Sequence, residues 1–119
     1  DGQRTLTMDG LGLHMLGPDE SVMLNEAGLA LIVEGKMRVL LTSDSPHLAM
    51  YDSHGKVRID VGVDFSESPS IAIHDSSENR RVVLGRASLQ GRKTGAELSL
   101  PESSLVLLDN KGGVIWRAP

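Results

Sequence analysis

The residues that could do chemistry in this chain are four histidines, a set of recurring aspartates and a column of arginines. A zinc ion binds imidazole nitrogens at about 2.0 to 2.1 Å, so its ligands must converge on one point. When the repeats described below are aligned, His14 and His74 share a column but stand three repeats apart, which is too far for one ion. His54 falls in a turn and His47 follows Pro46, without the Ser and carboxylate of a catalytic triad. The histidines therefore predict no metal site.

Aspartates recur where turns begin, at Asp52, Asp75 and Asp109. A calcium loop needs several oxygen ligands, whereas each of these turns offers one Asp. We interpret the aspartates as acceptors for the backbone of their own turns. The sequence also lacks a nucleophile elbow, a phosphate-binding glycine loop and a paired-carboxylate site. These observations predict that the protein is not an enzyme and uses no cofactor or small-molecule substrate.

Arginine is the one polar residue type that repeats in register, at Arg38, Arg58 and Arg81, and a later loop adds Arg92 and Lys93. Such a column could bind anionic groups on a partner or a glycan. Charged strand residues can equally serve to keep a β-surface soluble and to prevent edge pairing. These five residues are the candidate partner-binding residues. The chain has few aromatic residues on which a sugar could stack, which disfavours the glycan.

The elements that must position these residues come from a five-fold repeat, whose copies begin near Leu11, Leu29, Leu48, Ile71 and Leu105. In each copy the next apolar residue follows two positions later, which is the period of a β-strand. A turn and a returning strand come next. In the clearest copy, Asp52 opens the turn and Gly55 closes it, which is typical of a hairpin with the glycine at positive φ. The repeat predicts tandem hairpins.

We predict a single β-repeat domain over residues 1–119, with an insertion at 85–104. The insertion is expected to be either a binding loop or an extra hairpin that extends the sheet. Arg4 to Met8 align with a returning strand whose usual partner strand is missing. This segment is expected either to have lost its partner with an upstream segment or to pair with another segment and cover an end of the array. Trp116 ends an apolar column with Val39, Ile59 and Val82 that is expected to face the core, so the sequence predicts a buried Trp cap.

Composition narrows the partners further. The formal net charge of -4 leaves no sustained basic field for nucleic acid. There is no run of about eighteen apolar residues, so no membrane span is predicted within the chain. The absence of cysteine excludes disulfide and thiolate chemistry.

Two segments, Tyr51 to Arg58 (YDSHGKVR) and Ser103 to Asp109 (SSLVLLD), carry a resemblance. They are similar to uncharacterised bacterial proteins with tandem repeats of the form S-P-x-L-x-L-x-D-x-x-G-K-x-R-x-x-L-G. The similarity covers most of residues 1–119, but the first two copies are degenerate and the insertion after Gly85 departs from the pattern. The resemblance implies a β-repeat module that is often extracytoplasmic, and it brings no catalytic motif.

The expected fold class is all-β, with tandem antiparallel hairpins stacked as a roll or solenoid around an aliphatic core. A parallel β-solenoid and a trimeric fibre module are the alternatives. The expected function is a non-catalytic structural or interaction module, a scaffold or accessory subunit of a larger extracytoplasmic or cell-surface assembly, with a protein partner or self-association. The alternative is a binding domain for an anionic partner or glycan that uses the arginine column and the 85–104 loop.

Overall fold

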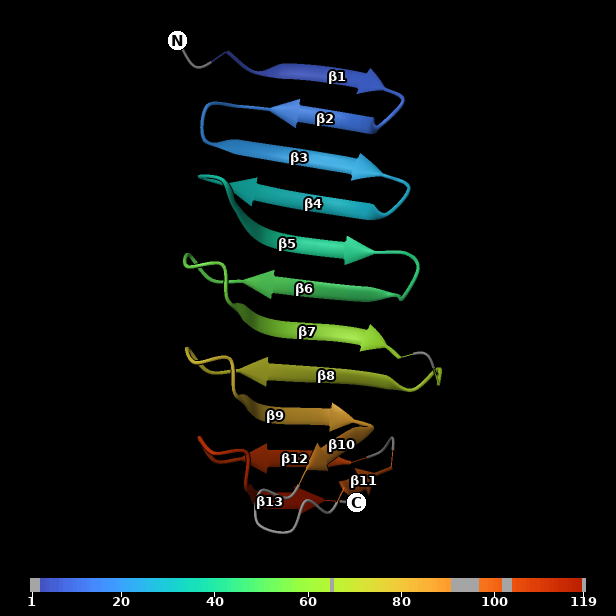
Figure 1. The fold of residues 1–119 in the computed structure, drawn as a ribbon, viewed down its shortest axis with the longest axis vertical. Helices are drawn as coiled ribbons and strands as arrows, with labels where there is room; N and C mark the ends of the chain where they lie inside the picture. Colours follow the sequence, from blue (N-terminus) through green and yellow to red (C-terminus); the bar gives the residue numbers. More distant parts are fainter. Residues whose placement is uncertain (1–2, 65, 91–96, 102–103, 119) are drawn as a thin grey trace.

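A computed structural model describes residues 3–64, 66–90, 97–101 and 104–118, and within them it contains only strands and turns (Figure 1). The strands, in chain order, are β1 (Thr5–Asp9), β2 (Gly12–Leu16), β3 (Glu20–Asn25), β4 (Gly28–Val33), β5 (Lys36–Thr42), β6 (His47–Tyr51), β7 (Val57–Val63), β8 (Pro69–His74), β9 (Arg80–Gly85), β10 (Ala87–Gln90), β11 (Glu97–Leu100), β12 (Leu105–Leu108) and β13 (Val114–Ala118).

Eleven of these strands form one sheet in the order β1-β2-β3-β4-β5-β6-β7-β8-β9-β12-β13. Nearly every strand pairs with the strand that precedes it in sequence, because each turn returns the chain beside the strand it has just left. All described pairings are antiparallel. The prediction of an all-β chain of tandem antiparallel hairpins is confirmed. The hairpins lie edge to edge in an open sheet, however, and the described strands do not close into a roll around a central core.

The ends of the repeat differ from the expectation. β1 is not left without a partner, since Thr5 to Asp9 pair with Leu16 to Gly12 of β2. The insertion does contain an extra hairpin, β10 and β11, but this hairpin forms a separate two-stranded sheet. β12 pairs directly with β9, so the main sheet continues past the insertion without it. Figure 1 shows the β10–β11 hairpin in front of β12, on one side of the main sheet.

One end of four returning strands carries a β-bulge. The register shifts opposite Ile32, Tyr51, His74 and Leu108. The extra residues at these places are Arg38, Arg58, Arg81 and Ile115. A bulge leaves one residue unpaired and bends its strand. The arginine column of the sequence is thus the column of bulged residues.

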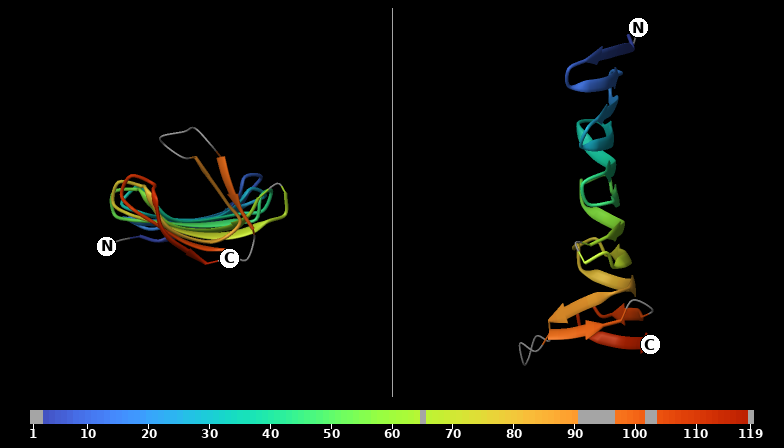
Figure 2. Two further views of the ribbon diagram at one scale, coloured as in Figure 1. Left: turned by 90° about the horizontal axis from the view of Figure 1, so that it is seen from below. Right: turned by 90° about the vertical axis from the view of Figure 1, so that its right-hand side faces the viewer.

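The opposite ends of several strands begin or finish with glycine at positive φ. Gly12, Gly28 and Gly85 have φ values of 126°, 144° and 105°, and a Cβ at any of them would collide with the carbonyl oxygen of a neighbouring strand. The bulges thus provide bends near one edge of the sheet and the glycines near the other, and β9 contains both. Figure 2, seen along the stack, shows a crescent-shaped cross-section whose two ends turn to the same side.

The most buried apolar residues lie together on one face of this crescent. Ala72, Val83 and Val106 are cross-strand partners, and they form a buried cluster with Leu108. Side chains converge on the inside of a curved sheet, and Figure 2 shows the β10–β11 hairpin projecting to that inner side. We therefore assign the buried cluster to the concave face. This small cluster takes the place of the aliphatic core expected from the sequence.

Candidate protein interaction surface

The convex face of the sheet carries two unbroken rows of apolar side chains. Side chains alternate between faces along a strand, and directly opposed residues of neighbouring strands share a face. The first row runs Met8, Leu13, Leu24, Leu29, Leu41, Leu48, Val61, Ile71, Leu84, Leu105 and Ala118. The second runs Leu6, Met15, Val22, Leu31, Val39, Met50, Ile59, Ile73, Val82, Leu107 and Trp116. We call these two rows the apolar stripe.

No residue of the apolar stripe is fully buried, and many are as exposed as polar surface residues. Met15 is 50 %, Leu41 46 % and Ile73 43 % exposed. The prediction of a buried Trp cap is wrong for the isolated chain, since Trp116 is 49 % exposed. The predicted apolar column that contains Val39, Ile59, Val82 and Trp116 exists, but it faces outward because no second layer of described residues lies over it.

A shallow hollow of about 450 Å³ lies on the apolar stripe between β5 and β9. Its apolar floor comes from the first row of the stripe, and prolines lie at its rim. The lining includes Leu41, Leu48, Val61, Ile71, Leu84, Pro46 and Pro69. The hollow gives the stripe relief into which a partner's side chains could fit.

On the concave face, the residues that lie between the two rows of the stripe along each strand form a middle row, which includes His14, Met23, Ala49, Asp60 and Ala72. The Nε2 atom of His14 is buried there and has no hydrogen-bond partner among the described residues. Asp60 takes the place in this row that Ala49 and Ala72 take on the neighbouring strands. Its Oδ2 lies 2.6 Å from Nε2 of His74, and Nδ1 of His74 lies 3.2 Å from the carbonyl oxygen of Glu78. Both side chains are largely covered, with 20 % and 11 % exposed. Each ring nitrogen of His74 thus has an oxygen within hydrogen-bonding distance, and the contact links β7, β8 and the Asp75 turn.

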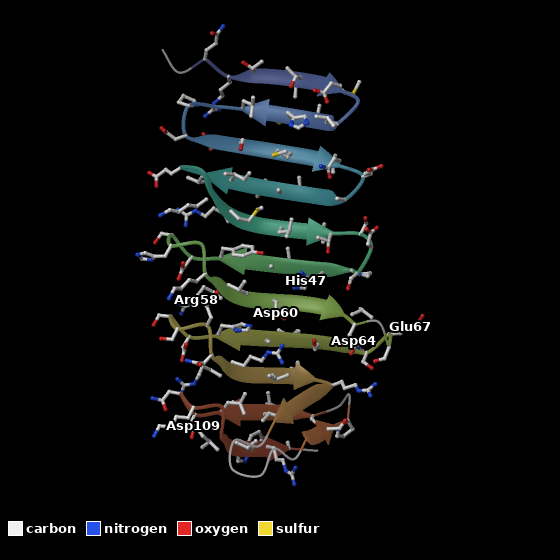
Figure 3. The ribbon with its side chains drawn as sticks, in the orientation of Figure 1. His47, Arg58, Asp60, Asp64, Glu67 and Asp109 are labelled. Carbon is white, nitrogen blue, oxygen red and sulfur yellow. The ribbon has the colours of Figure 1, made fainter. Side chains whose placement is uncertain are left out.

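Aspartate builds one type of turn at both edges of the sheet. In the Asp52 turn, Oδ1 accepts the backbone N–H groups of His54 and Lys56 at 2.8 and 3.1 Å. Turns that begin at Asp64, Asp75 and Asp109 repeat this pattern with the residues two and four positions later. Figure 3 shows Asp109 at one edge of the sheet and Asp64 at the other.

The hydrogen bonds of these turns lower the pKa of each aspartate. For Asp52 and Asp109 the main cause is the N–H donated by Lys56 and Gly113 respectively, and for Asp64 it is the hydroxyl of Ser66. For Asp75, partial desolvation works in the opposite direction, but its N–H donors outweigh it and the pKa is lowered. Asp52, Asp75 and Asp109 are turn acceptors, as the sequence predicted, and Asp64 is a further one that the sequence analysis did not name.

The arginines of the bulge column lie beside the same turns. Arg58 Nη1 is 3.5 Å from Asp52 Oδ2, and Arg81 Nη1 is 3.6 Å from Asp75 Oδ2. Arg58 is labelled in Figure 3. Arg81 also donates through Nε to the carbonyl oxygen of Leu108 at 2.9 Å. None of the described ion pairs involves Arg38. Arg58 and Arg81 thus have partners within the sheet, and Arg92 and Lys93 lie outside the described residues.

At this edge, two lysines each connect one hairpin to the next. Lys36 Nζ donates to the carbonyl oxygen of Ser53 at 2.9 Å, and Lys56 Nζ donates to that of Ser76 at 2.8 Å. Because successive turns repeat, a lysine of one hairpin reaches the turn of the following hairpin. The basic residues along this edge connect neighbouring repeats.

The histidines are dispersed in the structure. His14 pairs with Met23, and Met23 pairs with Ala30, so His14 lies in the middle row and not in the column of Ile32 where alignment placed it. The sequence alignment matched Leu11 with Leu29, whereas the structure places Leu13 in the row of Leu29, so the first copy is displaced by two positions. Among the described residues, no three His, Cys, Asp or Glu side chains gather closely enough to hold a metal ion.

Comparisons with known proteins add no assignment, since no protein family, curated protein or solved structure matches this chain. The described residues include no helix long and apolar enough to cross a membrane. The structure thus defines a class by its form: an open, single-layer sheet of tandem antiparallel hairpins with an apolar stripe along one face.

Proposed function

We propose that this protein is a non-catalytic structural or interaction module, a scaffold or accessory subunit that assembles through the apolar stripe. The observation that carries the proposal is the continuity of the stripe: both rows are apolar on all eleven strands of the main sheet. Contiguous apolar surface on this scale is rare on monomeric proteins, and it marks protein interaction sites. The resemblance to bacterial repeat proteins supports an extracytoplasmic setting.

The exposed surface area of the chain is large for its mass, which supports a partner over one face of the sheet. A monomer of 12.8 kDa typically exposes roughly 6,300 Å², whereas this chain exposes 8269 Å². Its radius of gyration is 17.7 Å, against roughly 13.5 Å for a compact domain of this length. A sheet covered on one face by a partner would remove much of this excess exposure.

The alternative, a binding domain for an anionic partner, has less support. Arg58 and Arg81 have carboxylate partners inside the sheet, and Lys36 and Lys56 bind backbone carbonyls. A ligand that used this column would first have to displace those contacts. Surface ion pairs are weak, so this cost is modest, but it applies to two of the three arginines of the column.

Methionine oxidation tests the proposal within one chain. Met15 and Met50 lie on the apolar stripe, whereas Met23 lies in the middle row of the concave face. In the native cell extract we expect Met15 and Met50 to oxidise more slowly than Met23, after each rate is divided by its rate in urea. Equal or faster oxidation of the stripe methionines in that extract would contradict the proposal, because the stripe would then be uncovered where the protein works.

A further inference from the structure

We propose that the apolar stripe is covered by the stripe of a second copy of this chain, in a two-fold, face-to-face sandwich. This inference rests on the proposed function and names the partner for the same surface. Three features of the described residues carry it: the area of the stripe, the curvature of the sheet and the polar residues that border the stripe.

The area of the stripe matches what a stable dimer needs. The sheet extends 56 Å along its longest axis. Two rows of side chains separated by two residues of strand cover a width of roughly 13 Å. Each copy would therefore bury roughly 700 Å², or roughly 1,400 Å² for the pair, which falls within the standard size of specific interfaces.

The stripe is self-complementary because it repeats. The same two apolar rows recur on every strand, so a rotated copy presents the same pattern at the same spacing. Two-fold dimers use one patch on both subunits, and a patch of this kind needs no second, differently shaped surface. Facing sheets pack about 10 Å apart, which is the distance that two layers of Leu, Ile, Val and Met side chains fill.

Curvature favours two copies over three. Figure 2 shows that the cross-section of the sheet is curved, with one convex face. Both rows of the stripe lie within the strands, between the two edges of the sheet, so two copies can meet along the middle of their convex faces. Three convex faces around a three-fold axis would touch along their flanks. On the same face, beside the second row, the flank carries Glu20 and Lys36 on either side of Val33. A polar flank suits the rim of a two-fold interface and not the centre of a three-fold one.

Sedimentation equilibrium of the purified chain at tens of micromolar is the first test. We expect a mass of twice 12.8 kDa. Met50→Lys combined with Ile73→Lys places two charges on the apolar stripe, and we expect it to weaken dimerisation by at least about 100-fold. The matched control is Ser77→Lys with Asn110→Lys, which adds the same charge to exposed turns and should leave the dimer intact.

Two further measurements use the unmodified chain, so they remain informative if the lysine variant fails to fold. In the unmodified chain, dilution through the dissociation range should raise the oxidation rate of Met15 and Met50 but not that of Met23. Over the same range, emission from Trp116, the sole Trp of the chain, should shift to the red as it becomes exposed.

A monomer, a trimer or an indefinite aggregate of the unmodified chain would overturn the two-fold inference, and so would a dimer that survives Met50→Lys with Ile73→Lys. A monomer whose stripe methionines are reactive when pure but protected in the native extract would leave the proposed function standing with a different partner. Reactive stripe methionines in that extract would remove both.

Discussion

The two faces of the main sheet are made by the same strands, yet they differ sharply in burial. On β12, Val106 is 0 % exposed on the concave face, and the next residue, Leu107, is 37 % exposed on the convex face. Both are ordinary aliphatic residues, so hydrophobicity does not distinguish them. What differs is the surroundings: the concave face curves inward and has the β10–β11 hairpin on its side at the C-terminal end, whereas no described strand lies over the convex face.

The difference in burial indicates which parts of the sheet stabilise the isolated chain. A cluster of Ala72, Val83, Val106 and Leu108 lies beneath neighbouring side chains near the C-terminal end of the sheet. At the other end, Leu6 and Met8 on β1 are 65 % and 83 % exposed. The concave face therefore supplies most of the burial within one copy, whereas in the proposed assembly the convex face would gain its burial from a partner.

The largest expected effect comes from placing a charge on one face or the other. Val106→Asp puts a carboxylate among apolar side chains without a partner, and we expect it to cost more than about 4 kcal/mol and to unfold the chain. Leu107→Asp, on the adjacent residue, should cost less than about 2 kcal/mol in the monomer, because its carboxylate remains in water. Urea denaturation followed by circular dichroism, at a concentration where both variants are monomeric, measures the difference. Equal losses would mean that the two faces are equivalent in one copy.

A smaller effect on folding stability is expected from substitutions in the turns that lie beside the β-bulges. Gly55 has φ of 81°, and nothing lies within 4 Å of a Cβ placed on it. Gly55→Val should therefore cost somewhat more than about 1 kcal/mol for conformational reasons alone, because a β-branched residue rarely adopts positive φ.

Glu78 provides the matched control for Gly55, since it occupies the same position of its turn with φ of 63°. Glu78→Gly should be neutral or should stabilise the chain by up to about 1 kcal/mol. Melting temperatures of the two variants and the parent measure both effects. A neutral Gly55→Val together with a destabilising Glu78→Gly would show that the positive φ is not what these turns require.

The strands and their turns were predictable because their signals are local. Alternation around Leu48, Ile71 and Leu105 predicted strands, and Asp52 with Gly55 predicted the turn that the structure contains, with Gly55 at positive φ. The repeated columns also predicted which residues of neighbouring hairpins would align, including the arginines that turn out to be bulged. Local periodicity and turn chemistry carry this information within a few residues.

The exposure of the apolar rows was not predictable in the same way. Period-two alternation indicates that Val39, Ile59 and Trp116 share a face, but it does not show what covers that face. A closed roll and an open sheet have the same alternation, and they differ in contacts between distant residues. For the same reason the position of β10 and β11 on one side of the main sheet, rather than at its edge, could not be derived from the local pattern of the 85–104 insertion.

The smallest expected effect per residue is the loss of folding stability at low pH, when the turn aspartates at both edges of the sheet are protonated. The pKa values of Asp52, Asp64, Asp75 and Asp109 are all lowered from the usual 3.8. A carboxyl whose pKa is lower in the folded than in the unfolded chain binds fewer protons when folded, so it contributes stability above its unfolded pKa and loses that contribution as pH falls through its folded pKa. The urea midpoint should therefore be level as pH falls toward 4 and should decrease below it.

Asp75→Asn isolates one of these carboxyls. The amide oxygen of Asn can still accept the N–H groups of Ser77 and Asn79, but it does not titrate in this range. We expect the variant to keep the turn and to show a shallower loss of stability between pH 4 and pH 2 than the parent. A parent and variant with the same slope would mean that the Asp75 carboxylate is not held by its turn in solution. In that case the bending of the strands at this edge would depend on the β-bulges alone. The difference in burial between the concave and convex faces would then have to arise from those bulges.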